Sequence, residues 1–387
     1  MTPTDQPPTA ATQHGFDAAT ADLLESGGFA RTAVTGVRTV ATGVMEVTLD
    51  RQGAFPPGAH LELAIAAEQD PTADPMIRHY SLCSDPAGDE PWRIAVLNEP
   101  LGRGGSTWLH ENLGPGSQLM VRGPRSTFPF HDDRPALFIA GGIGITPLHA
   151  MVRSAARAGL DWHLIYVGRT AELMAFATDL QDSHGPRVDV RITETGGRPD
   201  VVGLAAAWLD ERTPTAPEAP APVVYTCGPQ PLMDAVARGL ADRPGVTVEF
   251  EEFVSDPQPP AAAGTAPAEA GAPGFPAGGD EPAGTSAIAA GTDSAHDPSN
   301  EPFVVELADG TEVEVGSTET ILTALGRAGI RTLSSCQKGT CGTCETTILE
   351  GEAIHRDEVL SDEEHEAQET MMICVSRCRG ARICLDL

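Results

Sequence analysis

The chain has 387 residues and a formal net charge of −30. Its length allows two or three domains, and its charge argues against nucleic acid as a partner, because few cations could neutralise phosphates. No apolar run approaches the ~18 residues that span a membrane, and residues 1–16 lack the basic start and apolar core of a signal peptide. We therefore expect no membrane association.

The first third of the chain predicts a tail and a barrel. Residues 1–29 are rich in Pro, Thr and Ala, so we expect a disordered tail apart from a short helix over Ala18–Leu24. Residues 30–130 contain short β-type runs broken by Gly and Pro. These runs predict six strands, over 32–40, 44–49, 59–66, 79–84, 93–97 and 118–122. Six short strands with such turns indicate a small antiparallel β-barrel.

Residues 131–254 alternate between strand and helix patterns, which predicts a parallel sheet with helices on both faces. The predicted strands are 136–140, 163–167, 188–193, 223–226 and 246–250. The predicted helices are 148–158, 172–180, 201–209 and 231–240.

Residues 255–301 predict a linker, since Pro, Ala and Gly fill 28 of its 47 positions. Such a segment buries too little apolar surface to offset its ordering entropy, so we expect it to be disordered. Its r.m.s. span of roughly 35–40 Å favours a mobile C-terminal domain. That domain, 302–387, is predicted to be α+β, with a hairpin around Asp309-Gly310 and a helix over 321–328.

Three cysteines in this last domain follow the pattern C-x4-C-x2-C, and a fourth follows after a gap of 29 residues: Cys336, Cys341, Cys344 and Cys374. This is the ligand spacing of a plant-type 2Fe–2S cluster. Gly339 and Gly342 let the loop fold closely around the sulfurs. The alternative is a structural zinc site, although zinc sites more often pair two short knuckles. Thiolate-bound iron favours a reducing compartment, so we expect the cytoplasm.

Two motifs in the barrel are candidates for flavin binding. Arg78-His79-Tyr80-Ser81-Leu82 lies on a predicted strand, where Arg78 can pair with a phosphate and Tyr80 can lie against an isoalloxazine ring. Gly102-Arg103-Gly104-Gly105-Ser106 precedes a predicted helix over 107–112, which is typical of a phosphate cradle. The alternatives are an ordinary strand and an N-capped turn.

Two motifs in the parallel-sheet domain are candidates for nicotinamide binding. Gly141–Pro147 follows a strand and opens a helix, with Pro147 predicted at its first position. It is not the GxGxxG fingerprint, because Pro147 stands where the last glycine belongs. Cys227-Gly228-Pro229 ends a later strand, and ligands bind at the carboxyl ends of such strands. The alternative for Cys227 is a small buried hydrophobe.

Taken in order, RHYSL, GRGGS, PRSTFPF, GGIGITP, CGPQPLMDAV and the cysteine loop resemble the phthalate dioxygenase reductase family, over about residues 30–254 and 302–387. The resemblance implies a multidomain fold: an FMN-binding antiparallel β-barrel, an α/β NAD domain and a β-grasp plant-type ferredoxin domain. It also implies an iron–sulfur flavoprotein oxidoreductase that uses FMN, a 2Fe–2S cluster and NADH.

Carried over residue by residue, the resemblance assigns a role to each motif. It implies FMN contacts from Arg78, Tyr80, Ser81, Gly104, Gly105 and Ser106. It places the NAD pyrophosphate at Gly142, Gly144, Thr146 and Pro147, with Gly228 and Pro229 near the nicotinamide. It makes Cys227, near the nicotinamide, and Glu252, close to the flavin, the catalytic candidates. Leu97 stands where members often carry Lys, and Arg103 or Arg122 is the candidate replacement.

The implied function is transfer of electrons from NADH through FMN and the cluster to a terminal oxygenase. The oxygenase is either a Rieske non-haem iron enzyme acting on aromatic acids or a haem-thiolate monooxygenase. A redox-sensing binding protein is the alternative from another class. Arg169 ends the second strand of the NAD domain, where it could accept a 2′-phosphate, so NADPH is the open alternative to NADH. A monomer is expected.

Overall fold

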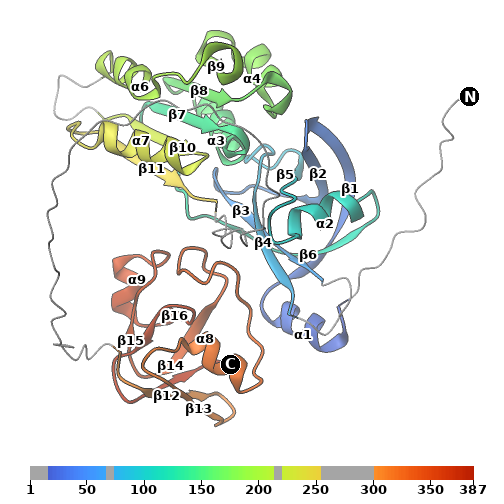
Figure 1. Ribbon diagram of the computed structural model, residues 1–387, viewed down its shortest axis with the longest axis vertical. Helices are drawn as coiled ribbons and strands as arrows, with labels where there is room; N and C mark the ends of the chain where they lie inside the picture. The colour runs from blue at the N-terminus through green and yellow to red at the C-terminus, as the bar shows by residue number, and fades with distance from the viewer. Residues whose placement is uncertain (1–15, 67–73, 213–219, 254–299) are drawn as a thin grey trace, which may run out of the picture.

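The computed structural model describes residues 16–66, 74–212, 220–253 and 300–387. Within them it has the predicted multidomain class: an antiparallel sheet, a parallel sheet and a small mixed sheet (Figure 1). Nearly all of the predicted linker, 255–301, lies outside the described residues.

The first domain is a six-stranded antiparallel barrel in the order β4-β3-β6-β1-β2-β5. A bridge between Leu82 and Ile94 joins its two ends. Its elements are β1 (Ala30–Ala41), β2 (Val44–Gln52), β3 (His60–Ile65), β4 (Met76–Ser81), β5 (Pro91–Leu97), α2 (Gly105–Asn112) and β6 (Gln118–Arg125). All six predicted strands are present, and inward-facing aliphatic side chains with Trp92 and Trp108 fill the barrel.

The short helix expected over Ala18–Leu24 is present as α1 (Ala18–Ser26). It begins at Asp17, whose side chain accepts the N–H of Thr20 at 2.8 Å. Leu24 is fully buried and packs with Phe29 and barrel residues, so the helix covers the outside of the barrel. Residues 1–15 of the expected tail lie outside the described residues.

The second domain is a five-stranded parallel sheet in the order β11-β10-β7-β8-β9. Its strands are β7 (Ala136–Gly141), β8 (Trp162–Gly168), β9 (Val188–Ile192), β10 (Val223–Cys227) and β11 (Thr247–Glu251). Its helices are η1 (Gly142–Gly144), α3 (Ile145–Ala158), η2 (Ala171–Leu173), α4 (Ala177–His184), η3 (Gly185–Arg187), α5 (Thr193–Gly196), α6 (Val201–Asp210) and α7 (Gln230–Leu240).

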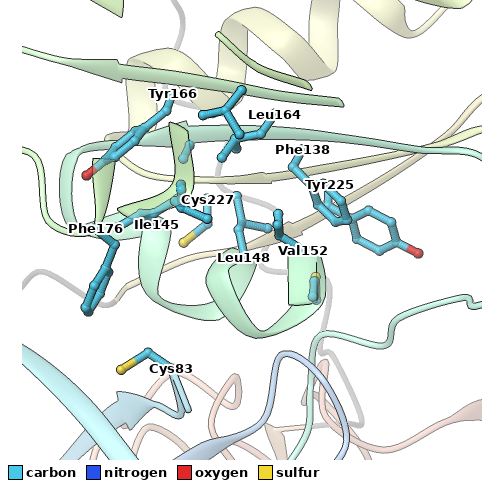
Figure 2. Close-up of a cluster of buried hydrophobic side chains, with 14 of the residues drawn as sticks. Cys83, Phe138, Ile145, Leu148, Val152, Leu164, Tyr166, Phe176, Tyr225 and Cys227 are labelled. Atoms are coloured by element: carbon cyan, nitrogen blue, oxygen red, sulfur yellow. The ribbon is translucent and has the colours of Figure 1, made fainter. Parts of the chain in front are cut away.

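Alternate residues of β7 face different cores of this domain. Phe138 packs with α3 and α4 residues, as Figure 2 shows with Leu148, Tyr225 and Cys227 around it. Leu137 and Ile139 pack with α6 and α7 on the other face. Burial of both faces explains why the central strands read as continuous apolar runs.

The predicted helix over 172–180 is wrong in its first half. The chain forms the short η2 turn and then bends at Phe176, which has a φ of 62°. The bend buries Met174 against Gly168 and brings the Phe176 ring to 4.7 Å from that of His149. Burial of these side chains overrides the local helix propensity.

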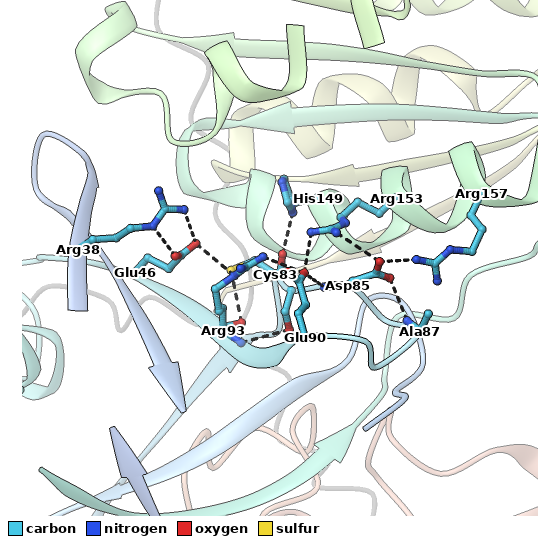
Figure 3. A network of polar contacts seen from close by, with 11 residues as sticks. Arg38, Glu46, Cys83, Asp85, Ala87, Glu90, Arg93, His149, Arg153 and Arg157 are labelled. Atoms are coloured by element: carbon cyan, nitrogen blue, oxygen red, sulfur yellow. Dashed lines mark hydrogen bonds and ion pairs between the residues drawn. The ribbon is translucent and has the colours of Figure 1, made fainter. Parts of the chain in front are cut away.

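A polar network fixes the parallel-sheet domain to the barrel (Figure 3). Arg153 and Arg157 on α3 both pair with Asp85, and Arg153 also donates to Glu90 at 2.8 Å. His149 Nδ1 lies 2.7 Å from the backbone oxygen of Cys83. Burial lowers the pKa of His149 to about 4, so the ring is neutral and donates its proton to this carbonyl.

The C-terminal domain is a mixed β-grasp sheet in the order β13-β12-β18-β14-β16, in which β12 and β18 are parallel. Its elements are β12 (Phe303–Leu307), β13 (Glu312–Val315), α8 (Ile321–Arg327), β14 (Glu345–Glu350), β15 (Ala353–Ile354), α9 (Asp362–Ala367), β16 (Thr370–Met372), β17 (Arg377–Cys378) and β18 (Arg382–Leu385). The predicted hairpin is present, with Gly310 at a φ of 86° in its turn.

Among the described residues, none of the helices has both the length and the apolar character needed to cross a membrane.

Candidate functional site

The predicted phosphate cradle forms between β4 and the start of α2. A Cβ on Gly105 would lie 2.7 Å from Nε of Arg78, so only glycine lets the arginine side chain rest there. Gly104 precedes the helix with a φ of 83° and no side-chain cap. Ser106 Oγ accepts the N–H of Glu99 at 3.0 Å and ties the loop to β5. A guanidinium beside a helix N-terminus suits a phosphate.

Tyr80 and Ser81 lie on opposite faces of β4, as strand alternation requires. Tyr80 packs partly against the barrel core, and burial raises the pKa of its phenol, which stays neutral. Ser81 is buried, and its Oγ faces the Glu251 carboxyl, although it makes no hydrogen bond of good geometry among the described residues. Because the two side chains point to opposite faces of β4, contact of both with FMN stays a prediction.

The two nicotinamide motifs pack against each other. A Cβ on Gly144 would lie 2.2 Å from the backbone oxygen of Cys227, and one on Gly228 would lie 2.8 Å from the Cα of Gly141. These glycines are needed for the two loops to touch. Gly142 is different: its φ is 54° and nothing lies within 4 Å of a Cβ placed there. The open position for a ligand is therefore Gly142, while Gly144 closes the loop.

Thr146 and Pro147 support this loop from inside. Thr146 donates its hydroxyl to the backbone oxygen of Ile143 at 3.0 Å and is 2% exposed. Pro147 is also buried, and it is the third residue of α3 instead of the predicted first. Both side chains are buried and shape the turn; that this turn lines the NAD pyrophosphate site stays a prediction.

Cys227 is fully buried at the end of β10, among the apolar residues of Figure 2. Burial raises the pKa of its thiol well above the ordinary value, so the sulfur stays protonated. A neutral thiol at the carboxyl end of the sheet can pack against a nicotinamide ring, but it is not a nucleophile.

Of two neighbouring carboxylates, Glu251 lies largely inside the protein and the predicted Glu252 faces solvent. Glu252 is exposed and accepts a hydrogen bond from Gln230 at 3.2 Å. Glu251 pairs in register with Cys227, and its side chain is only 11% exposed. Burial raises the pKa of Glu251 to about 8, and its Oε2 has no hydrogen-bond partner among the described residues. Because neighbouring strand residues face opposite ways, an error of one position chose the solvent-facing side chain.

Four buried cysteines come together in the C-terminal domain: Cys336, Cys341, Cys344 and Cys374, each at most 9% exposed. Side-chain hydrogen bonds with Cys341 and Cys374 lower the pKa of the Cys336 thiol, as is expected where thiols lie close together. Gly339 and Gly342 adopt φ values of 77° and 76°, as the tight loop requires. The donor set of four convergent sulfurs fits a 2Fe–2S cluster.

The cysteine loop docks on the barrel through a buried carboxylate that sequence reasoning missed. Glu62 on β3 is fully buried; it pairs with Arg122 and accepts the Thr343 hydroxyl at 2.6 Å. Arg122 also donates to the backbone oxygen of Thr343 at 3.2 Å. Burial opposes ionisation of Glu62, but the Arg122 hydrogen bonds outweigh it and lower the pKa. The Arg122 side chain is therefore used in this junction. It does not replace the lysine that members of the resembled family often carry at the position of Leu97.

Further contacts surround this junction. Arg125 donates to Glu345 at 2.6 Å and to the backbone oxygen of Gly342 at 3.2 Å. Arg331 pairs with Asp74 at 2.8 Å, and Ser335 donates to the backbone oxygen of Ile77 at 3.0 Å. The contact is therefore largely polar, unlike the interior of either domain.

A second cluster of metal-ligating groups, His355, Asp357 and His365, lies behind the cysteine loop. The Asp357 carboxylate already accepts the backbone N–H of Leu360 at 3.0 Å and the hydroxyl of Ser376 at 3.3 Å. A Cβ on Gly339 would lie 3.0 Å from the Cα of Asp357. We interpret this cluster as a support for the cysteine loop.

Comparison with known proteins decides the family. The model for the 2Fe-2S iron-sulfur cluster binding domain matches residues 305–379. The phthalate dioxygenase reductase of Burkholderia cepacia is 34% identical, over 93% of this chain and 98% of its own. The chain belongs to the phthalate dioxygenase reductase family. The predicted multidomain class and oxidoreductase activity are therefore confirmed, as is the prediction of a reductase component that serves an oxygenase system.

Two solved structures extend this result. A phthalate dioxygenase reductase, described as modular for electron transfer from pyridine nucleotides to [2Fe-2S], matches with a TM-score of 0.56 and 30% identity, over 94% of this chain and 99% of its own. An intact type IV self-sufficient cytochrome P450 monooxygenase matches with a TM-score of 0.66 and 32% identity over 93% of this chain. The chain spans 41% of that P450's length. The predicted cofactors, FMN, a 2Fe–2S cluster and NADH, are those of the family.

Replacing Gly105 should weaken flavin binding. In Gly105→Ala the new methyl group displaces Arg78 from the helix N-terminus, and we expect a rise of about tenfold or more in the FMN dissociation constant, which is ~1.4 kcal/mol. Flavin fluorescence titration measures it. The matched control is Gly114→Ala, where nothing lies within 4 Å of the added Cβ. Equal FMN affinity in both variants would contradict this assignment.

Glu251 should make stability depend on pH. Its native pKa is about 8, above the ordinary 4.5, so between these values the folded chain holds a proton that the unfolded chain releases. The free energy of unfolding should then fall as pH rises from about 5 to 8, by up to ~1.4 kcal/mol per pH unit. Chemical denaturation at several pH values should show this slope lost in Glu251→Gln and kept in the exposed control Glu252→Gln. The opposite pattern would reverse the assignment of the two carboxyls.

Proposed function

We propose that this protein carries electrons from NADH, through FMN in the barrel and a 2Fe–2S cluster held by Cys336, Cys341, Cys344 and Cys374, to a Rieske-type aromatic oxygenase. One observation carries the proposal: the cysteine loop lies against the same barrel that holds the phosphate cradle, joined by the Thr343–Glu62 hydrogen bond of 2.6 Å. When bound, FMN converts a two-electron hydride into single electrons that the cluster can carry.

The chain's own residues position these groups. Arg78, Gly104, Gly105 and the start of α2 bind the FMN phosphate, while Tyr80 and Ser81 line the ring site. Gly142 leaves room for the dinucleotide, with Gly144, Thr146, Pro147, Gly228 and Pro229 building the loops around it. These roles follow from the contacts described above and from the family's pattern.

Cys227 and Glu251 control charge beside the nicotinamide site. Cys227 Sγ and the Glu251 carboxyl both stay protonated near pH 7, because burial raises the pKa of each. Because both groups are neutral, neither puts a negative charge at this edge of the sheet, next to the nicotinamide ring that would give up a hydride. We assign Glu251 the role that the sequence pattern gave to Glu252.

The partner assignment rests on the relatives. Several of them are named as reductase subunits of phthalate 4,5-dioxygenase or toluene-4-sulfonate monooxygenase systems. A haem-thiolate monooxygenase is the second candidate, favoured by the likeness to the self-sufficient P450. The C-terminal domain has 16 acidic and 7 basic residues. We expect it to dock against a basic surface of either partner. We further propose that the protein is a monomer in the cytoplasm, where thiolates stay reduced.

Removing one proposed cluster ligand should separate the two halves of the electron path. Cys374→Ala should lose the cluster and at least about 90% of cytochrome c reduction, while NADH-dependent ferricyanide reduction stays within about twofold because it needs only the flavin. Iron content and visible absorbance give the cluster occupancy. Cys384→Ala, a cysteine outside the proposed set, is the control. A cluster retained by Cys374→Ala and lost by Cys384→Ala would refute the ligand set.

A further inference from the structure

The Thr343 hydroxyl lies between the barrel and the cysteine loop, with three polar neighbours. Its Oγ1 is 2.6 Å from Glu62 Oε1, 3.1 Å from His79 Nε2 and 3.3 Å from Sγ of Cys341. Glu62 and His79 belong to the barrel, whereas Cys341 belongs to the same loop as Thr343. The residue is 2% exposed, so these are its partners and water does not compete.

A hydroxyl group has one proton to donate. In the docked arrangement the shortest contact goes to the ionised Glu62 carboxylate, and hydrogen bonds to charged acceptors are the strongest. His79 Nε2 can donate to the same oxygen, which completes a chain from His79 through Thr343 to Glu62. In this arrangement Cys341 Sγ receives no proton from Thr343. Without a cluster the Cys341 thiol donates to Thr343 Oγ1 at 3.3 Å, whereas a ligating thiolate would have no proton and could only accept.

Departure of the barrel reverses this choice. Glu62 leaves with the barrel and keeps its ion pair with Arg122. Of the three polar neighbours, only Cys341 Sγ, two residues away in the same loop, would stay with the Thr343 hydroxyl, where it would compete with water as the acceptor. Hydrogen bonds to cluster sulfurs stabilise the reduced state and raise the reduction potential.

We propose that Thr343 is a docking-dependent switch that gives its proton to Glu62 when the C-terminal domain is docked and to Cys341 Sγ when the domain is released. The proposal rests on ligation of the cluster by Cys341, as stated under the proposed function. The proton is shared in a hydrogen bond in both states and is never transferred, so reduction adds one electron and removes nothing.

Linkage gives this switch a consequence for electron delivery. If release raises the potential of the cluster, then reduction of the cluster must weaken docking by the same factor. The hydroxyl therefore favours release of the domain once it carries an electron and disfavours return of that electron to the barrel. Arg122 and Arg125 lie near the loop and attract a reduced, more negative cluster, which opposes release. The effect of the hydroxyl on the potential is therefore measured as a difference between variants with and without it.

The test uses the full chain loaded with FMN and cluster, and reads the cluster potential by EPR-monitored redox titration. Thr343→Val removes the hydroxyl. It is made both in the docked chain and in a release variant, Arg125→Glu with Arg331→Glu, whose two charge reversals break ion pairs at the junction. Small-angle scattering confirms release by an increased radius of gyration. Arg238→Glu with Arg379→Glu makes the same charge change on exposed side chains outside the junction.

We expect Thr343→Val to leave the potential of the docked chain nearly unchanged and to lower that of the released chain. Thr343→Ser should behave as the wild type in both. Equal lowering in both states would show that the hydroxyl always donates to Cys341, and no lowering in either would show that it never does; both results overturn the switch. If the charge reversals do not separate the domains, Glu62→Ala removes the acceptor directly. Loss of its negative charge raises the potential in any background, so the switch predicts a larger rise with Thr343 present than in Thr343→Val, and equal rises would overturn it.

The reciprocal measurement compares oxidised and reduced chains by scattering. Reduction should increase the radius of gyration more in the wild type than in Thr343→Val, and equal changes would overturn the proposal. Iron content and the EPR signal of each variant keep this result separate from the proposed function. A chain without a cluster refutes the ligand set, whereas a loaded cluster that ignores Thr343 refutes only the switch.

Discussion

The buried ion pair between Glu62 and Arg122 is the interaction on which the arrangement of this protein depends. A carboxylate with no exposed surface in a barrel strand is costly unless it is fully paired. Here Arg122 supplies one set of hydrogen bonds and Thr343 of the cysteine loop supplies another. The barrel therefore presents a charge that is satisfied completely only when the C-terminal domain is in place. This makes docking specific without a large apolar contact.

The two interfaces of the barrel differ in kind, and the difference matches their tasks. Toward the parallel sheet, residues of both domains share one apolar core, and His149 and Arg153 of α3 add polar contacts across the boundary. That boundary would hold the proposed flavin and nicotinamide sites in one geometry. Toward the cysteine loop, ion pairs and hydrogen bonds prevail, which separate at lower cost in water. These two boundaries support the proposal of a fixed hydride site and a separable electron carrier.

Sequence patterns predicted those features of the structure that depend on neighbouring residues in the chain. The cysteine spacing, the glycines before α2 and the strand–helix alternation each act within a short stretch, and the structure has the elements they predicted. Three features escaped. Glu251 was missed because a shift of one residue on a strand exchanges its faces. The bend at Phe176 accompanies packing of its ring 4.7 Å from that of His149, 27 residues earlier in the chain. The role of Glu62 depends on its hydrogen bond with Thr343, 281 residues later in the chain, and no local sequence pattern predicts that contact.

The account is tested most directly by anaerobic stopped-flow mixing of the loaded protein with NADH. Flavin absorbance should bleach first, and cluster absorbance should follow with a rate constant that does not change over about a tenfold range of protein concentration. Concentration independence is required if each cluster is reduced by the barrel against which its own loop is docked. A cluster phase whose rate rises in proportion to protein concentration, or a cluster reduced without prior bleaching of the flavin, would contradict the account.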